Sequence, residues 1–125
     1  MLNGFTQETA PLSDMERAYV PIFVSRLREA VGRESAVYNQ QLQSLAPSLS
    51  SARVRKIINF IRTEGLVPCL VASSKGYYIA ESEEELREYE ESLRGRADAI
   101  MEVCRSIERQ RQRRYGEKAE QGRLF

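Results

Sequence analysis

The sequence predicts an α+β fold that is mostly helical, and three observations predict it. Apolar side chains recur at helical spacing over residues 54–61. Strand-forming residues flank a turn over residues 66–80, which predicts a two-stranded hairpin. A helical apolar period then continues through residues 82–114. We therefore expect a small helical domain that carries one hairpin and is followed by a long C-terminal helix.

Composition limits what this domain can do. The chain has 125 residues, of which 42% are hydrophobic, and this is enough for one independently folded core. With no histidine and two cysteines, a zinc site or a Ser/His or Cys/His nucleophile is improbable. The sequence also contains no Gly-rich phosphate loop. We expect no enzyme and no cofactor.

The expected location follows from what the sequence lacks. No signal peptide or membrane span is recognisable, so we expect a cytoplasmic protein without a membrane partner. In that compartment Cys69 and Cys104 stay reduced, and we expect both to act as small apolar core residues.

The first part of the chain predicts two helices. Residues 1–12 are expected to form a flexible arm, and Ser13 with Glu16 has the spacing of a capping box that opens a helix to about Val31. Pro21 must either kink this helix or delay its start.

A shorter second helix is expected to start at Ser35 or Ala36. It ends at Leu45, which joins Val37 and Leu42 as candidates for the core.

The third helix is basic. Its apolar stripe consists of Val54, Ile57, Ile58 and Ile61. Lys56 and Asn59 lie on the opposite face, where we expect them to meet solvent or a ligand. Three arginines flank that face, namely Arg53, Arg55 and Arg62. Ser50 or Ser51 can cap its start, and Gly65 suits a left-handed C-cap.

The hairpin follows directly. Residues 66–72 favour a strand, residues 73–76 form a turn, and residues 77–80 return as a second strand. A helix–turn–helix followed by a hairpin is typical of the winged helix-turn-helix, in which the hairpin is a two-stranded wing. The alternative is a generic α+β domain that uses the same helices only for packing.

Charge is segregated along the C-terminal helix. Residues 81–94 contain seven glutamates and two arginines, whereas residues 105–114 contain five arginines and one glutamate. The helix macrodipole favours this order, so the arginines are either a solvated helix end or a second phosphate-contacting surface. Because the helix is longer than one small core needs, we expect its apolar residues to pair with a second copy, giving a homodimer.

The runs RVRKIINFIR (53–62) and ASSKGYYIA (72–80) resemble small winged-helix DNA-binding proteins of bacteria and phages. The resemblance covers roughly residues 13–110. It implies a double-stranded DNA partner, with the basic helix in the major groove and the wing on phosphate or in the minor groove. The contacts it implies are Ser51, Arg53, Arg55, Lys56, Asn59 and Arg62 on the helix, with Ser73, Ser74 and Lys75 on the wing.

The expected division of the chain is an arm (1–12), a winged-helix domain (13–81), a long helix (82–114) and a flexible tail (115–125).

The last five residues resemble the peptide by which bacterial replication and repair proteins bind the DNA polymerase sliding clamp. Gln121, Leu124 and Phe125 match the pattern, while Gly122 and Arg123 depart from its commonest form. The resemblance implies a clamp partner. The alternative is that the two apolar residues pack back on the domain.

Together these patterns predict a non-enzymatic DNA-binding protein of phage or bacterial replication or regulation, tethered to the clamp by its C-terminus. Two alternatives remain: a prophage or mobile-element transcriptional repressor, and a winged-helix protein-interaction module that does not bind DNA.

Overall fold

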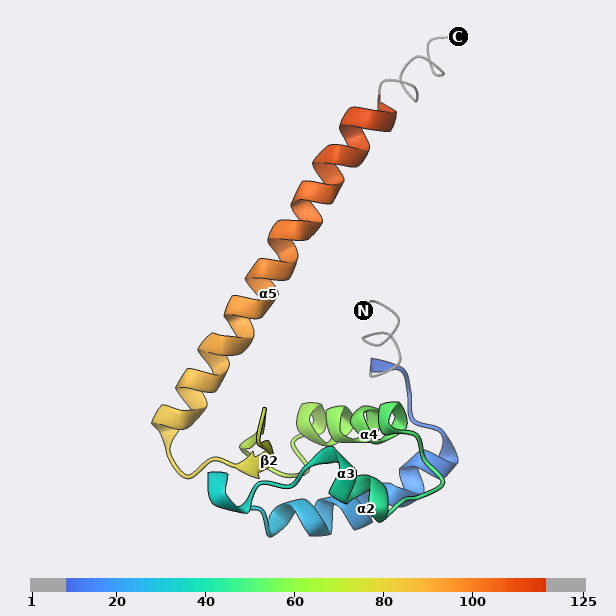
Figure 1. The fold of residues 1–125 in the computed structure, drawn as a ribbon, viewed down its shortest axis with the longest axis vertical. Coiled ribbons are helices and arrows are strands. Elements are labelled where there is room, and N and C mark those ends of the chain that lie inside the picture. Colours follow the sequence, from blue (N-terminus) through green and yellow to red (C-terminus); the bar gives the residue numbers. More distant parts are fainter. Residues whose placement is uncertain (1–8, 117–125) are drawn as a thin grey trace. The chain divides into compact units, whose positions relative to one another are not determined.

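The computed structural model describes residues 9–116. They fall into two compact units, the first ending at Leu86 and the second beginning at Arg87. Figure 1 traces the elements along the chain. They are α2 (Asp14–Arg28), a 3₁₀ turn (Arg33–Ser35), α3 (Asn39–Ser44), α4 (Ser51–Glu64), β1 (Leu70–Ser73), β2 (Gly76–Ile79), α5 (Glu83–Arg111) and a π-helical turn (Gln112–Gly116). The predicted class is confirmed: the fold is mostly helical, with a two-stranded antiparallel sheet and a long C-terminal helix.

The core of the first unit lies where α2, α3 and α4 pack together (Figure 1). Its largest fully buried apolar side chains are Phe23, Leu27, Val37, Leu42, Leu49, Val54, Ile57, Ile58, Ile61 and Val67. Burial of these branched and aromatic groups is the main force that holds the three helices together.

Helix α2 begins with the predicted capping box. The Ser13 hydroxyl accepts from the Glu16 amide, and the Glu16 carboxylate accepts from the Ser13 amide. The helix runs through Pro21, so a delayed start is wrong. It also ends at Arg28 rather than near residue 31. The carbonyl of Ala30 instead accepts a hydrogen bond from the Ile79 amide of β2.

The expected second helix is wrong in its first half. The Val37 amide donates to the Tyr77 carbonyl, and the Tyr77 amide donates back, so this segment pairs with β2 and α3 begins only at Asn39. Val37 and Leu42 are buried as expected, whereas Leu45 is exposed.

Gly76 permits this close approach to β2. Its φ is 105°, and a Cβ there would lie 2.5 Å from the Val37 carbonyl oxygen.

The hairpin pairs β1 with β2 in antiparallel register, with Leu70 opposite Ile79 and Ser73 opposite Gly76. Its first strand starts four residues later than expected, after a turn in which Cys69 has a positive φ of 64°. Cys69 is exposed, and so is Cys104 on α5, which corrects the expectation that both cysteines are core residues.

Helix α5 continues through Gly95, and none of its residues is buried. Among residues 9–116, no helix is both long enough and apolar enough to cross a membrane.

Candidate nucleic-acid interface

Helix α4 is built as the sequence predicts. All four stripe residues are buried, Ser50 is the N-cap through its bond with the Arg53 amide, and Gly65 is the C-cap at φ 67°. Burial of one face fixes which side chains remain on the others. Arg55 is exposed, while Arg53, Lys56, Asn59 and Arg62 are half-buried.

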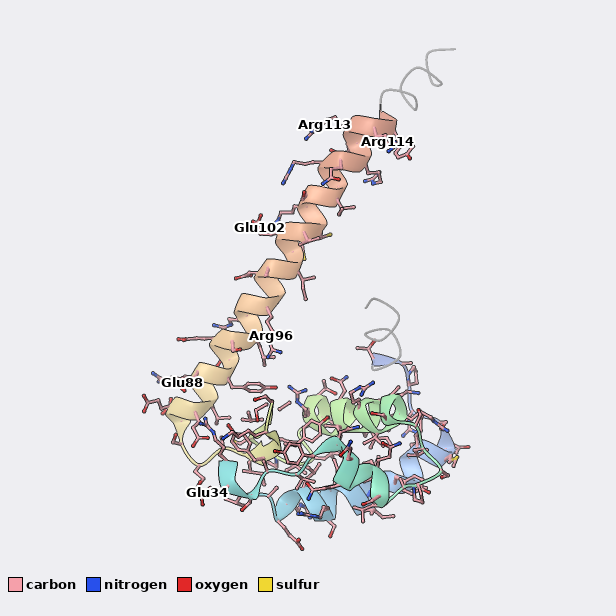
Figure 2. All side chains as sticks on the ribbon, in the orientation of Figure 1. Glu34, Glu88, Arg96, Glu102, Arg113 and Arg114 are labelled. Atoms are coloured by element: carbon pink, nitrogen blue, oxygen red, sulfur yellow. The ribbon has the colours of Figure 1, made fainter. Side chains whose placement is uncertain are left out.

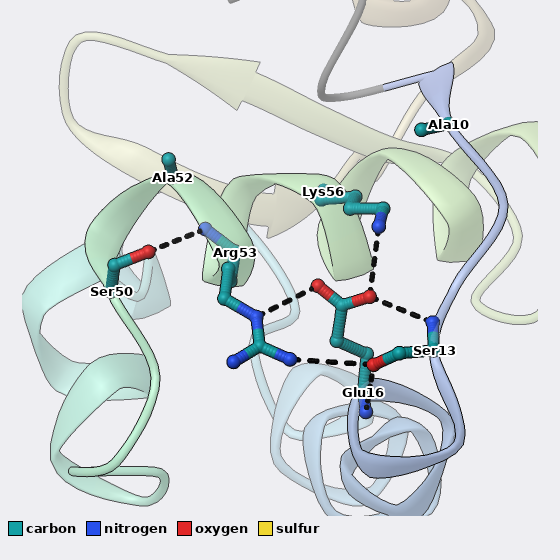
Figure 3. A pocket seen from close by; sticks show the side chains of 7 residues that line it. All are labelled: Ala10, Ser13, Glu16, Ser50, Ala52, Arg53 and Lys56. Carbon is teal, nitrogen blue, oxygen red and sulfur yellow. Dashed lines mark hydrogen bonds and ion pairs between the residues drawn. The ribbon is translucent and has the colours of Figure 1, made fainter.

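A buried carboxylate organises the first turns of α4 (Figure 3). Glu16, from the first turn of α2, is only 2% exposed. Its Oε1 accepts from Lys56 Nζ at 2.8 Å and its Oε2 accepts from Arg53 Nε at 3.1 Å. A second guanidinium nitrogen of Arg53 donates to the Ser13 hydroxyl at 3.3 Å. One carboxylate thus ties α2 to two cations of α4.

The same contacts keep Glu16 ionised. Burial alone raises its pKa, because a charged carboxylate loses hydration there. Hydrogen bonds from Lys56, Ser13 and Arg53 outweigh this effect and lower the pKa from 4.5 to about 2. The three charged side chains therefore carry one net positive charge at neutral pH.

Glu16 determines how far the two cations reach solvent. The Arg53 side chain is 38% exposed and that of Lys56 is 16% exposed. Lys56 therefore faces α2 rather than lying open on the outer face, as the helical period alone suggested. The Glu16 capping box was predictable, but its partners lie 37 and 40 residues away and no local pattern signals them.

A second network holds the start of α4 to the rest of the unit. The Ser51 hydroxyl accepts from Asn39 Nδ2 and from Arg55 Nη1, both at 2.9 Å. Tyr77 in turn donates to Asn39 Oδ1 at 3.3 Å. Ser51, expected as a nucleic-acid contact, is thus already engaged in joining α3, α4 and β2 and in orienting Arg55.

The hairpin tip presents Ser74 and Lys75 at the surface. The Ser73 hydroxyl accepts from the Lys75 amide and donates to the Gly76 carbonyl, so Ser73 stabilises the turn. Lys75 also lines a shallow hollow, together with Arg33, Glu34, Ala36 and Tyr38. Sequence reasoning missed Arg33 and Tyr38 as neighbours of the tip, because it assigned part of their segment to a helix.

The hollow drawn in Figure 3 lies beside the Glu16 cluster. It is lined by Ala10, Ser13, Glu16, Ser50, Ala52, Arg53 and Lys56. The Glu16 carboxylate offsets one of the two positive charges of Arg53 and Lys56, so these three side chains leave a net charge of +1 beside the hollow. Within the described part of the chain, no group of three or more His, Cys, Asp or Glu side chains could hold a metal ion.

The predicted clamp-binding residues Gln121, Leu124 and Phe125 lie outside the described residues, so that interpretation stays a prediction. Comparisons with protein-family models, with curated proteins and with solved structures find no match to this chain.

Proposed function

We propose that this chain is a non-enzymatic protein that binds double-stranded DNA through α4 and the β1–β2 hairpin. The observation that carries the proposal is the charge on α4. Its apolar stripe is buried, and its other faces carry Arg53, Arg55, Lys56 and Arg62. These cations flank the buried stripe on both sides, and a helix lined by cations is the footprint expected for phosphate contacts.

The charge balance supports this role even after the Glu16 contacts are counted. The four cations of α4 are opposed by Glu16 and Glu64, which leaves a net charge of +2. Lys75 adds a further cation at the exposed hairpin tip. The remaining positive charge is enough for a phosphate-directed surface although the whole chain carries only +1.

Glu16 acts in this proposal as a positioning residue. By holding Arg53 Nε and Lys56 Nζ, it fixes two flexible side chains before DNA arrives, which lowers the entropy lost on binding. The exposed part of the Arg53 guanidinium remains available to a phosphate, while Arg55 is fixed by Ser51 at the start of the helix.

The order of the elements supports a winged-helix mode of docking. In that mode α4 enters the major groove and the hairpin touches phosphate or the minor groove. Arg55 is then the strongest candidate for a base or phosphate contact, since arginine can bond guanine in a bidentate way. Lys75 contacts the backbone from the wing.

The experiment measures duplex binding by fluorescence anisotropy over a range of salt concentrations. Arg55→Glu with Lys75→Glu should weaken binding and lower the slope of log K against log salt by about 2. The matched control is Arg17→Glu with Arg28→Glu, which makes the same charge change on exposed residues of α2. If both double variants bind equally, the assignment of α4 and the hairpin is wrong.

The same assay separates the related roles. A strong preference for one sequence over random duplex favours a repressor, and sequence-independent binding favours a replication role. Absence of any binding at low salt would favour the interaction module and overturn the proposal. Clamp tethering through Gln121, Leu124 and Phe125 is tested separately, since Phe125→Ala should abolish clamp binding and leave DNA binding intact.

A further inference from the structure

We propose that α5 pairs with α5 of a second copy of this chain, and that the two helices run antiparallel. This goes beyond DNA binding, because it assigns a partner and an orientation to a helix that the DNA contacts do not use. Two observations carry it: an exposed apolar stripe and the distribution of charge along the helix.

The stripe has the spacing of a coiled-coil seam. Leu86, Leu93, Ile100 and Ile107 follow one another at intervals of seven residues. Ala97 and Cys104 lie between them on the same side of the helix. Ile100 is 63% exposed and Ile107 is 56% exposed, which is unusual for branched apolar side chains placed in register. A second helix with the same seam would cover them.

The distribution of charge along α5 favours a second copy of the same chain as the partner, and it favours an antiparallel orientation of the two helices. The start of α5 is rich in glutamate and its end is rich in arginine, and Figure 2 marks Glu88 near one end and Arg113 and Arg114 at the other. In a parallel pair, acidic turns would face acidic turns and basic turns would face basic turns. In an antiparallel pair each acidic half faces a basic half, and the two helix dipoles also oppose one another favourably.

The middle of the helix can accommodate such a pair. In an antiparallel pair centred near residues 96 and 97, Leu93 of one copy lies level with Ile100 of the other. Gly95 and Ala97 are small and leave room for close approach.

In this arrangement the N-terminal ends of the two α5 helices lie about 44 Å apart, which is the length of a 29-residue helix. A dimer of this kind carries two copies of the proposed DNA-binding surface, a consequence that rests on the proposed function. The pairing itself does not, and it is tested without DNA.

The association test is sedimentation of the full chain over a range of concentrations. The wild-type chain should be a dimer at micromolar concentrations, and Ile100→Glu should sediment as a monomer with the first unit still folded. Ile100→Leu is the matched control, since it keeps an apolar side chain at the same position and should remain dimeric. A wild-type chain that is monomeric throughout, or an Ile100→Glu variant that is still dimeric, overturns the proposal.

The orientation test uses the exposed cysteine of α5. In a Cys69→Ser background, Cys104 should not be joined to its own copy by a short bismaleimide, because the two thiols are far apart in an antiparallel pair. Adding Glu90→Cys should give cross-linked dimers, because residue 90 of one copy faces Cys104 of the other. Efficient Cys104–Cys104 cross-linking in the single variant would show a parallel pair and overturn the proposal.

Discussion

Helices α4 and α5 have the same kind of sequence pattern, but they differ in whether the apolar stripe is buried. Each combines an apolar stripe with charged flanks. In α4 the stripe is buried, with Ile57 fully covered, whereas in α5 Ile100 of the stripe is 63% exposed. Periodicity therefore identifies an amphipathic helix, but it does not say whether the covering surface comes from the same chain.

The charged flanks differ in the same way. Two cations of α4, Arg53 and Lys56, are held by Glu16, a buried residue distant in sequence. The ion pairs of Glu90 with Arg94 and of Glu102 with Arg105 on α5 are local and exposed. Exposed pairs of this kind contribute only a few tenths of a kcal/mol. Charge supports tertiary structure in α4, while these exposed pairs of α5 add little to stability.

The largest expected contrast is between the two stripes. Ile57→Ala should lower the free energy of unfolding of the first unit by about 2–5 kcal/mol, because it leaves a cavity in a closed core. Ile107→Ala should change it by less than about 0.5 kcal/mol, since that side chain is exposed. Urea unfolding of dilute protein, followed by the near-ultraviolet signal of the tyrosines, measures both. Equal losses of unfolding free energy in the two variants would contradict the difference between the two stripes.

Removal of the buried charge should have the next largest effect. Glu16→Gln leaves Arg53 and Lys56 without their anion and should lower the free energy of unfolding by about 3 kcal/mol. Glu29→Gln is the control, because that carboxylate is 75% exposed and its pair with Arg26 is 3.9 Å long. Similar losses for the two variants would mean that the Glu16 contacts add nothing to stability.

The pH dependence tests the same residue. Because the pKa of Glu16 is lowered to about 2 in the folded chain, its stabilising effect is complete above about pH 4.5 and is lost as the pH falls towards 2. The stability difference between the wild-type chain and Glu16→Gln should therefore shrink over this interval. A difference that stays constant down to pH 2 would show that Glu16 is not the titrating group.

Local rules were sufficient to predict α4. A strong apolar period, a serine N-cap and a glycine C-cap all agree over residues 50–65, and no tertiary contact works against them. The hairpin turn was predictable for the same reason, since Ser73 and Gly76 satisfy the local geometry of the turn.

The features that could not be predicted depend on contacts between segments that are distant in the sequence. Residues 35–38 have an acceptable helical sequence, but pairing of Val37 with Tyr77 satisfies their backbone in another way. The capping box accounted for Glu16 in the sequence, so its ion pairs with α4 were not predicted. Cys69 was expected in the core, but it lies exposed in the turn before β1. In each case the deciding partner lies elsewhere in the chain.

The smallest expected contrast is between the two helix starts. Ser50 accepts from the Arg53 amide at the start of α4, and Ser82 accepts from the Glu85 amide at the start of α5. Ser50→Ala should lower the free energy of unfolding by about 1 kcal/mol, because α4 cannot fray without uncovering the core. Ser82→Ala should leave the urea midpoint nearly unchanged and speed amide hydrogen exchange only in the first turn of α5, since fraying there exposes no buried residue of that helix. If Ser82→Ala lowers the midpoint as much as Ser50→Ala, the start of α5 is part of the same cooperative unit as α4, and the contrast between the two helices begins only further along α5.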